Sequence, residues 1–149
     1  MIVVIDTNAL LPALSTTHGY HVSFRAWLRG EFSLALSNEI LLEYEEIARP
    51  RLGELRWQHF LALLERLAML HENVLPLSPT FRFRLITADP DDDKFADCAI
   101  AAQADYVITE DRHFRPLAGA GFKPQPITPQ EFIARHLLGG AAPQSSPEL

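Results

Sequence analysis

The chain opens with a run of apolar, β-branched residues that stops at an acid. Met1 to Ile5 reads MIVVI, and Asp6 follows directly. A continuous apolar run of this kind is typical of a central strand in a parallel sheet, which is buried on both faces. Thr7 and Asn8 then supply side-chain oxygens of the kind that begin helices. The sequence therefore predicts a buried strand, an acid at its end and a helix immediately after it.

Short strands and helices alternate along the rest of the chain. We expect further strands at residues 32–36, 74–77, 106–109 and 125–127, and helices at residues 9–14, 20–28, 39–48, 52–70, 89–104 and 131–138, with Pro50 ending the third of these helices. Residues 78–88 alternate arginine with phenylalanine and leucine, which fits either a strand or an extended loop. Strands that alternate with helices predict an α/β fold with a central parallel sheet and helices on both faces.

The size of the chain fits one ordinary domain. Its 149 residues are 48% hydrophobic, which is enough for a single core. We expect this domain to span residues 1–138. Residues 139–149 are small or proline-rich and lack aromatics, so we expect a disordered tail there. Cys98 is the one cysteine, and neither a leader nor a long apolar segment stands out, so the cytoplasm is the expected compartment and no membrane contact is expected.

The charge balance argues against nucleic-acid binding by bulk attraction. The formal net charge is -6, whereas domains that hold nucleic acid electrostatically normally carry a basic face. A nuclease remains open, because acids gathered around a metal ion add to the negative count and the cation offsets them.

Acids crowd the segment from Asp89 to Asp111, which reads DPDDDKFADCAIAAQADYVITED. Asp93 and Asp97 are four residues apart, so on a helix they stack on one face. Like charges stacked in this way repel one another. We therefore expect a cation, an arginine or solvent between them.

Polar function in parallel sheets gathers beyond the carboxyl ends of the strands. Asp6 and Asp111 follow the first and fourth expected strands, and Asp93 and Asp97 lie in the first turns of a helix. The helix after the second strand offers a further carboxylate from one of four glutamates, Glu39, Glu43, Glu45 or Glu46. Oxygen-only clusters of this kind suit Mg²⁺ or Mn²⁺.

A divalent metal in such a pocket suits the hydrolysis of phosphodiesters. It can activate water and neutralise the charge that builds on a phosphate. The sequence contains no nucleophile elbow, phosphate-binding glycine loop or zinc-protease motif that would favour another chemistry.

Four segments, taken in order, resemble the PIN-domain family, and in particular the toxin ribonucleases of bacterial toxin–antitoxin systems. They read VIDTN at Val4–Asn8, SNEILLEYEEI at Ser37–Ile47, DPDDDKFADCAIAAQADYVITEDRHF at Asp89–Phe114 and ITPQEF at Ile127–Phe132. The resemblance implies a three-layer α/β/α sandwich and a metal-dependent ribonuclease that cleaves single-stranded RNA. It also implies a cognate antitoxin as partner.

The resemblance also implies roles for individual residues. The catalytic acids correspond to Asp6, Glu43, Asp97 and Asp111, with Asp93 as an additional acid of this subgroup. Metal ligands would be Asp6, Asp97, Asp111 and Asp93. Supporting polar residues would be Thr7, Asn8, Ser37 and Thr109. Two features depart from the pattern, namely Glu110, where relatives often carry glycine, and the Ser15–Tyr20 loop.

Basic side chains near the expected site are candidates for RNA contacts. These are Arg49, Arg51, Arg112 and His113, and each is equally compatible with a solvated, salt-bridged surface. Apolar helix faces such as Leu61–Leu70 leave room for a homodimer.

Two other functions are compatible with the pattern. One is a catalytically inactive binding module on the same fold. The other is an aspartyl-type phosphatase, which also begins with a strand that ends in aspartate, although its second acid is replaced here by Asn8.

Overall fold

The computed structural model describes residues 1–70, 72–119 and 121–138. The tail expected at residues 139–149 lies outside the described residues. No helix in the described part of the chain is both long and apolar enough to cross a membrane.

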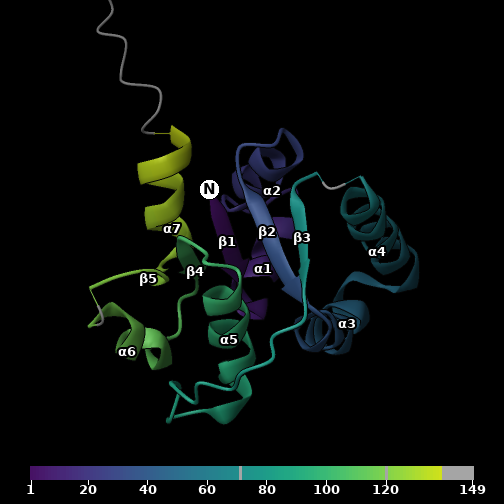
Figure 1. The fold of residues 1–149 in the computed structure, drawn as a ribbon. Coiled ribbons are helices and arrows are strands. Elements are labelled where there is room, and N and C mark those ends of the chain that lie inside the picture. The colour runs from purple at the N-terminus through teal and green to yellow at the C-terminus, as the bar shows by residue number, and fades with distance from the viewer. Residues whose placement is uncertain (71, 120, 139–149) are drawn as a thin grey trace, which may run out of the picture.

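A five-stranded parallel sheet forms the centre of the molecule (Figure 1). The strands lie in the order β3-β2-β1-β4-β5, which places the opening strand β1 in the middle. Val3 and Val4 of β1 are fully buried, as the apolar run predicts. The five expected strands are confirmed as β1 (Ile2–Ile5), β2 (Ser33–Ser37), β3 (Val74–Leu77), β4 (Tyr106–Ile108) and β5 (Gln125–Ile127).

Helices cover both faces of the sheet, which confirms the three-layer α/β/α sandwich. In Figure 1, α5 lies in front of the sheet and α1 lies behind it. The helices are α1 (Thr7–Leu14), α2 (His21–Leu28), α3 (Asn38–Leu52), α4 (Glu54–Met69), α5 (Asp93–Ala101), α6 (Arg115–Ala118) and α7 (Pro129–Phe132), together with the turns η1 (Pro90–Asp92) and η2 (Arg112–Phe114) and the π-helical η3 (Ile133–Leu138).

The carboxyl-terminal ends of α3 and α5 differ from the prediction by several residues. α3 passes through Pro50 and ends before Gly53, whose positive φ of 86° is a backbone conformation that favours glycine and cannot continue a helix. Pro50 lies in the last turn, where its missing N–H removes a single backbone bond. α5 ends at Ala101 rather than at residue 104, because Gln103 has a φ of 52°. Residues 78–88 form neither a helix nor a strand, which leaves the extended loop of the two alternatives.

Asp105 joins the start of β1 to the start of β4. Its backbone N–H donates to the Ile2 carbonyl at 2.7 Å, and the Ile2 N–H donates to Asp105 Oδ2 at 2.9 Å. Lys123 pairs with the other carboxylate oxygen, and this contact is the main reason that the pKa of Asp105 lies below its usual value. The side chain thus closes the amino-terminal edge of the sheet, opposite the edge where the acids gather.

We expect Asp105→Ala to lower the free energy of unfolding by about 1–3 kcal/mol, because it strands a partly buried N–H. Asp105→Asn should cost less, since it keeps an oxygen for Ile2 and loses only an exposed ion pair. The free energy of unfolding of the wild type should exceed that of Asp105→Asn above pH ~4, which is the pKa of an aspartate in the unfolded chain. This difference should vanish as pH falls through the lower pKa of Asp105 in the folded state. Urea unfolding at pH 7 and at pH 3 measures both effects. Equal stability of all three proteins would contradict this role.

Candidate metal centre

Carboxylates from four separate segments meet at the carboxyl-terminal edge of the sheet. Asp6 follows β1, Glu43 lies on α3, Asp92 ends η1, and Asp111 follows β4. Asp6 is only 4% exposed. Burial raises the pKa of Asp6, and the nearby charges of Glu43 and Asp111 raise it further. A buried acid with acidic neighbours is the arrangement that a cation relieves.

Threonines hold two of these carboxylates in place. Thr109 Oγ1 donates to Asp6 Oδ2 at 2.9 Å and accepts from the Asp111 N–H at 2.9 Å, so a single hydroxyl links two of the acids. The Thr7 hydroxyl donates to the Glu43 carboxylate, whose other oxygen accepts from Lys94 Nζ at 2.9 Å. Thr7 and Thr109, two of the four polar residues predicted to support the site, are thus in contact with acids of the cluster.

The other two residues predicted to support the site lie apart from these contacts. Ser37 is buried and caps α3, because its hydroxyl accepts from the Ile40 N–H at 3.2 Å. Asn8 is exposed in the first turn of α1.

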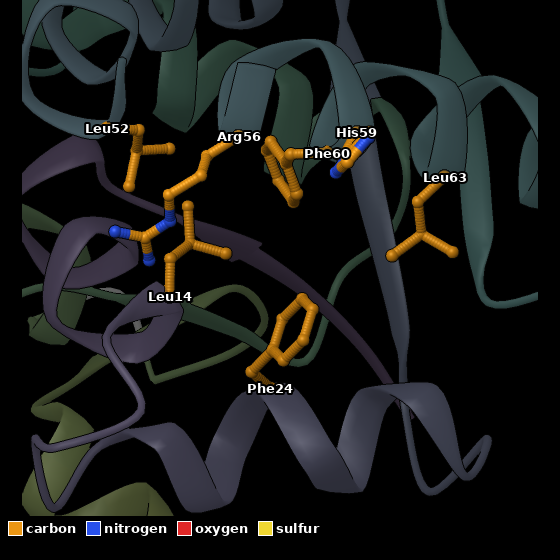
Figure 2. Close-up of a pocket in the computed structure, with 7 residues that line it drawn as sticks. All are labelled: Leu14, Phe24, Leu52, Arg56, His59, Phe60 and Leu63. Atoms are coloured by element: carbon orange, nitrogen blue, oxygen red, sulfur yellow. The ribbon is translucent and has the colours of Figure 1, made fainter. Parts of the chain in front are cut away.

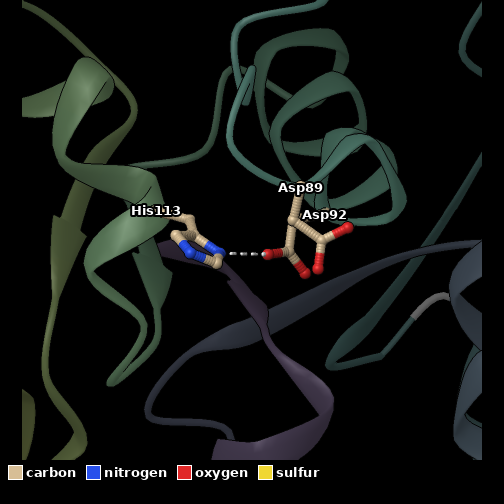
Figure 3. Close-up of side chains that lie close together, drawn as sticks. All are labelled: Asp89, Asp92 and His113. Carbon is tan, nitrogen blue, oxygen red and sulfur yellow. Dashed lines mark ion pairs between the residues drawn. The ribbon is translucent and has the colours of Figure 1, made fainter.

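Asp92, at the end of η1, also belongs to the cluster. His113 Nδ1 lies 3.5 Å from Asp92 Oδ2 and 3.2 Å from Asp111 Oδ1 (Figure 3). Asp92 Oδ2 is buried and has no hydrogen-bond partner among the described residues. Burial raises the pKa of Asp92 to about 7, and the charges of Asp6, Asp89 and Asp111 add to this effect.

Asp89, Asp92 and His113 also satisfy a simple geometric condition for metal binding. One potential ligand atom from each lies within 4.8 Å of the others. Asp89 has a second role as well, because its Oδ1 caps η1 by accepting from the Asp91 N–H at 3.1 Å. Figure 3 shows Asp89 and Asp92 facing His113 across the edge of the sheet.

Asp93 and Asp97 share one face of α5, as their spacing predicts, but that face does not point at Asp6. Asp97 Oδ1 accepts from the Phe83 N–H at 3.0 Å, and Asp93 Oδ1 accepts from the Ile86 N–H at 2.8 Å. Burial raises the pKa of Asp97, and the charged neighbours that act on it are Asp93, Glu39 and Arg82 rather than Asp6 or Asp111. The N–H groups of Phe83 and Ile86 and the charge of Arg82 therefore offset the repulsion between the two acids.

Asp92 therefore lies beside Asp6 and Asp111, where the sequence predicted Asp93 and Asp97. The reason is the entry into α5. Residues 90–92 form a 3₁₀ turn, in which successive side chains are about 120° apart, before the α-helix begins at Asp93. Neighbouring acids therefore point in different directions. The run DPDDD offers several candidates, and no local signal in the sequence says which one faces β1.

Among the basic residues expected to contact RNA, Arg49 is already engaged. Its guanidinium lies 2.7 Å from Glu45 and 2.6 Å from Glu54, and it bridges the break between α3 and α4. Arg51 and Arg112 are exposed. His113 lies against the acids, as described above, so it contacts carboxylates in this structure.

The two departures from the family pattern contact each other. The Tyr20 hydroxyl donates to Glu110 Oε1 at 2.7 Å, which ties the loop before α2 to the end of β4 beside Asp111. This bond is the main reason that the pKa of Tyr20 is raised.

An apolar hollow of about 250 Å³ lies elsewhere, between α2 and α4 (Figure 2). It shares no residue with the acid cluster. Its lining consists of Leu14, Phe24, Leu52, Arg56, His59, Phe60 and Leu63.

The residue types of the acid cluster suit a divalent cation, and among the described residues the ligand-distance condition is met by Asp89, Asp92 and His113. Two basic side chains lie against the four carboxylates of Asp6, Glu43, Asp92 and Asp111: Lys94 pairs with Glu43, and His113 pairs with Asp92 and Asp111. The buried Oδ2 of Asp92, which within the described part of the chain makes only the long 3.5 Å contact with His113, is an available ligand atom. Carboxylate oxygens are the donors that hard cations such as Mg²⁺ prefer.

Comparison with known families agrees with the fold. The sequence model of the PIN domain matches residues 2–113. The chain therefore belongs to the PIN domain family, whose members are generally metal-dependent nucleases. A search of curated proteins found no match.

We expect Asp92→Asn to raise the thermal midpoint of the metal-free protein by several degrees at pH 7.5 and to leave it unchanged at pH 4. An acid whose pKa rises from its ordinary value to about 7 on folding destabilises the folded state progressively as pH rises between those two values. The variant removes that penalty. Asp91→Asn is the matched control, because Asp91 is exposed on the same turn. The same shift in both variants, measured by calorimetry in chelator, would refute the burial of this charge.

Proposed function

We propose that this protein is a metal-dependent endoribonuclease that cleaves single-stranded RNA in the cytoplasm, and that it is the toxin of a toxin–antitoxin pair. Mg²⁺ or Mn²⁺ is the proposed cofactor. The observation that carries the nuclease proposal is the meeting of four carboxylates around the buried Asp6. Membership of the PIN domain family supports it.

Each residue of the cluster has a distinct part in the proposed reaction. Asp6, Asp92 and Asp111 would hold the cation. When bound, the cation supplies a Lewis acid that neutralises charge on the scissile phosphate. Glu43 is fixed from both sides by Thr7 and Lys94, which suits it to orient an attacking water beside Asp6. Thr109 keeps Asp6 and Asp111 in register.

We expect Asp6→Asn and Asp92→Asn to lower the rate of Mn²⁺-dependent RNA cleavage by about 100-fold or more, since each removes a charge that the cation needs. Both should also weaken Mn²⁺ binding in isothermal titration calorimetry. Asp97→Asn should keep Mn²⁺ binding, because Asp97 faces Phe83 instead of the cluster. Asp91→Asn is again the matched control.

Three results would count against the proposal. Undiminished cleavage by Asp6→Asn, with chelator controls, would exclude the acid cluster as the catalytic centre. Loss of Mn²⁺ binding in Asp97→Asn, with binding retained in Asp92→Asn, would indicate that the metal is bound by Asp93 and Asp97, as predicted from the sequence. Absence of Mn²⁺ binding in the wild type would favour a catalytically inactive binding module.

The toxin role is supported by the resemblance of the four segments quoted above to toxin ribonucleases. The toxin role implies a cognate antitoxin as partner. A homodimer is also expected, on the basis of the apolar helix faces. We expect expression of this chain alone to arrest growth, and expression of Asp6→Asn at the same level to be tolerated. Co-expression of a small protein encoded next to this gene should restore growth. Equal growth with wild type and Asp6→Asn would contradict a toxin whose action is cleavage.

A further inference from the structure

The connection from β3 to α5 carries an unusual exposed surface. We call residues 79–87 the strap. In it Phe81 is 72% exposed and Phe83 is 44% exposed, and their ring centroids lie 6.1 Å apart. Arg82 and Arg84 alternate with these rings, and both are exposed. Adjacent exposed aromatic rings form an apolar patch of the kind that marks an interaction site.

The strap is held in place by α5. Phe83 and Ile86 donate their N–H groups to Asp97 and Asp93, and the side chain of Ile86 is fully buried in the core. Arg84, between these two anchors, has a φ of 52°, a left-handed conformation that costs a bulky residue free energy. The two acids thus maintain a strained backbone that presents the rings outward.

The strap borders a groove that shares Lys94 with the surroundings of the acid cluster. A cavity of about 500 Å³ lies between the strap and the amino-terminal end of α5, and Arg82, Arg84 and Lys94 line it. Lys94 also contacts Glu43 of the acid cluster. Figure 1 shows the connection from β3 running past the foot of α5, at the edge of the sheet where the acids gather.

Basic side chains of the strap are open to a polyanion, although the acids Glu39, Asp91, Asp93 and Asp97 also line the groove. Asp93 and Asp97 are already engaged by N–H groups of the strap. Arg82 makes one weak surface contact with Glu39 at 3.7 Å. Arg84 forms no ion pair with any residue that the structure describes. Aromatic rings that alternate with arginine are the surface on which unpaired bases stack while phosphates are neutralised.

We infer that the strap binds single-stranded RNA, with bases stacked on Phe81 and Phe83 and a phosphate held by Arg84. Asp93 and Asp97 are positioning residues that hold the strap for this contact. This inference rests on the proposed nuclease function and supplies its substrate-binding surface. Because stacking tolerates any base, the strap would select single strands over duplexes rather than a particular sequence.

The test measures binding separately from cleavage. Fluorescence anisotropy of a labelled oligouridine would be recorded in the Asp6→Asn background with chelator, so that no RNA is cut. We expect Phe81→Ala and Phe83→Ala each to weaken binding about tenfold, which corresponds to one lost stacking contact. Phe122→Ala is the matched control, since Phe122 is 73% exposed and lies outside the strap. Thermal midpoints should remain unchanged, because the substituted rings are exposed.

Two further variants test the positioning role and the phosphate contact. Asp97→Ala should weaken RNA binding, and Asp97→Asn should restore most of it, because asparagine keeps an oxygen for the Phe83 N–H. Arg84→Gln should reduce the salt dependence of binding, as expected for a lost phosphate contact. A duplex of the same length should bind weakly to every variant.

The outcomes separate this inference from the proposed function. Unchanged RNA binding by Phe81→Ala and Phe83→Ala, with metal-dependent cleavage intact in the wild-type background, would overturn the role of the strap alone. The same result with loss of antitoxin binding would assign the strap to a protein partner and would also overturn the inference. If RNA binding depends on the strap but the wild-type protein cuts no RNA, the inferred role of the strap is supported and the nuclease proposal is contradicted.

Discussion

The site depends on one buried carboxylate at the end of the central strand. Asp6 cannot move toward solvent, because β1 is flanked on both sides by other strands and its own N–H is bound to the Ile108 carbonyl. The hydrogen bond from the Thr109 hydroxyl offsets part of the free-energy cost of burying this charge. Glu43 and Asp111 increase that cost. A divalent cation bound there would resolve the conflict, so the same constraint that destabilises the free protein would favour metal binding.

The amino-terminal part of α5 and the turn before it present acids in two directions, and these directions separate two tasks. Asp92 faces β1 and the other acids of the cluster, whereas Asp93 and Asp97 face the strap. Lys94 stands between them, with its amine on Glu43 and its side chain lining the groove. We interpret this arrangement as a metal centre beside a substrate-binding surface, joined by one short helix. Movement of α5 would disturb both.

Much of the architecture could be predicted from local patterns. The apolar run at Ile2–Ile5 determines a buried central strand, and the alternation of strands and helices determines the parallel sheet. Pro50 misled the prediction because proline is tolerated in a last turn, and the true end of the helix depends on the backbone of Gly53. The strap could not be predicted, since its conformation depends on two acids and a buried Ile86 that the chain supplies only after folding.

The sequence alone determined that Asp6 and Asp111 would lie at the same edge of the sheet, because parallel strands end together, and it determined that Asp93 and Asp97 would share a face of a helix. Only the tertiary structure decided which of the acids in DPDDD joins Asp6. That choice depends on how the 3₁₀ turn enters α5 and on how α5 rotates as it packs on β1, β2 and β4. A rotation of one residue exchanges Asp92 for Asp93, and no local pattern specifies it.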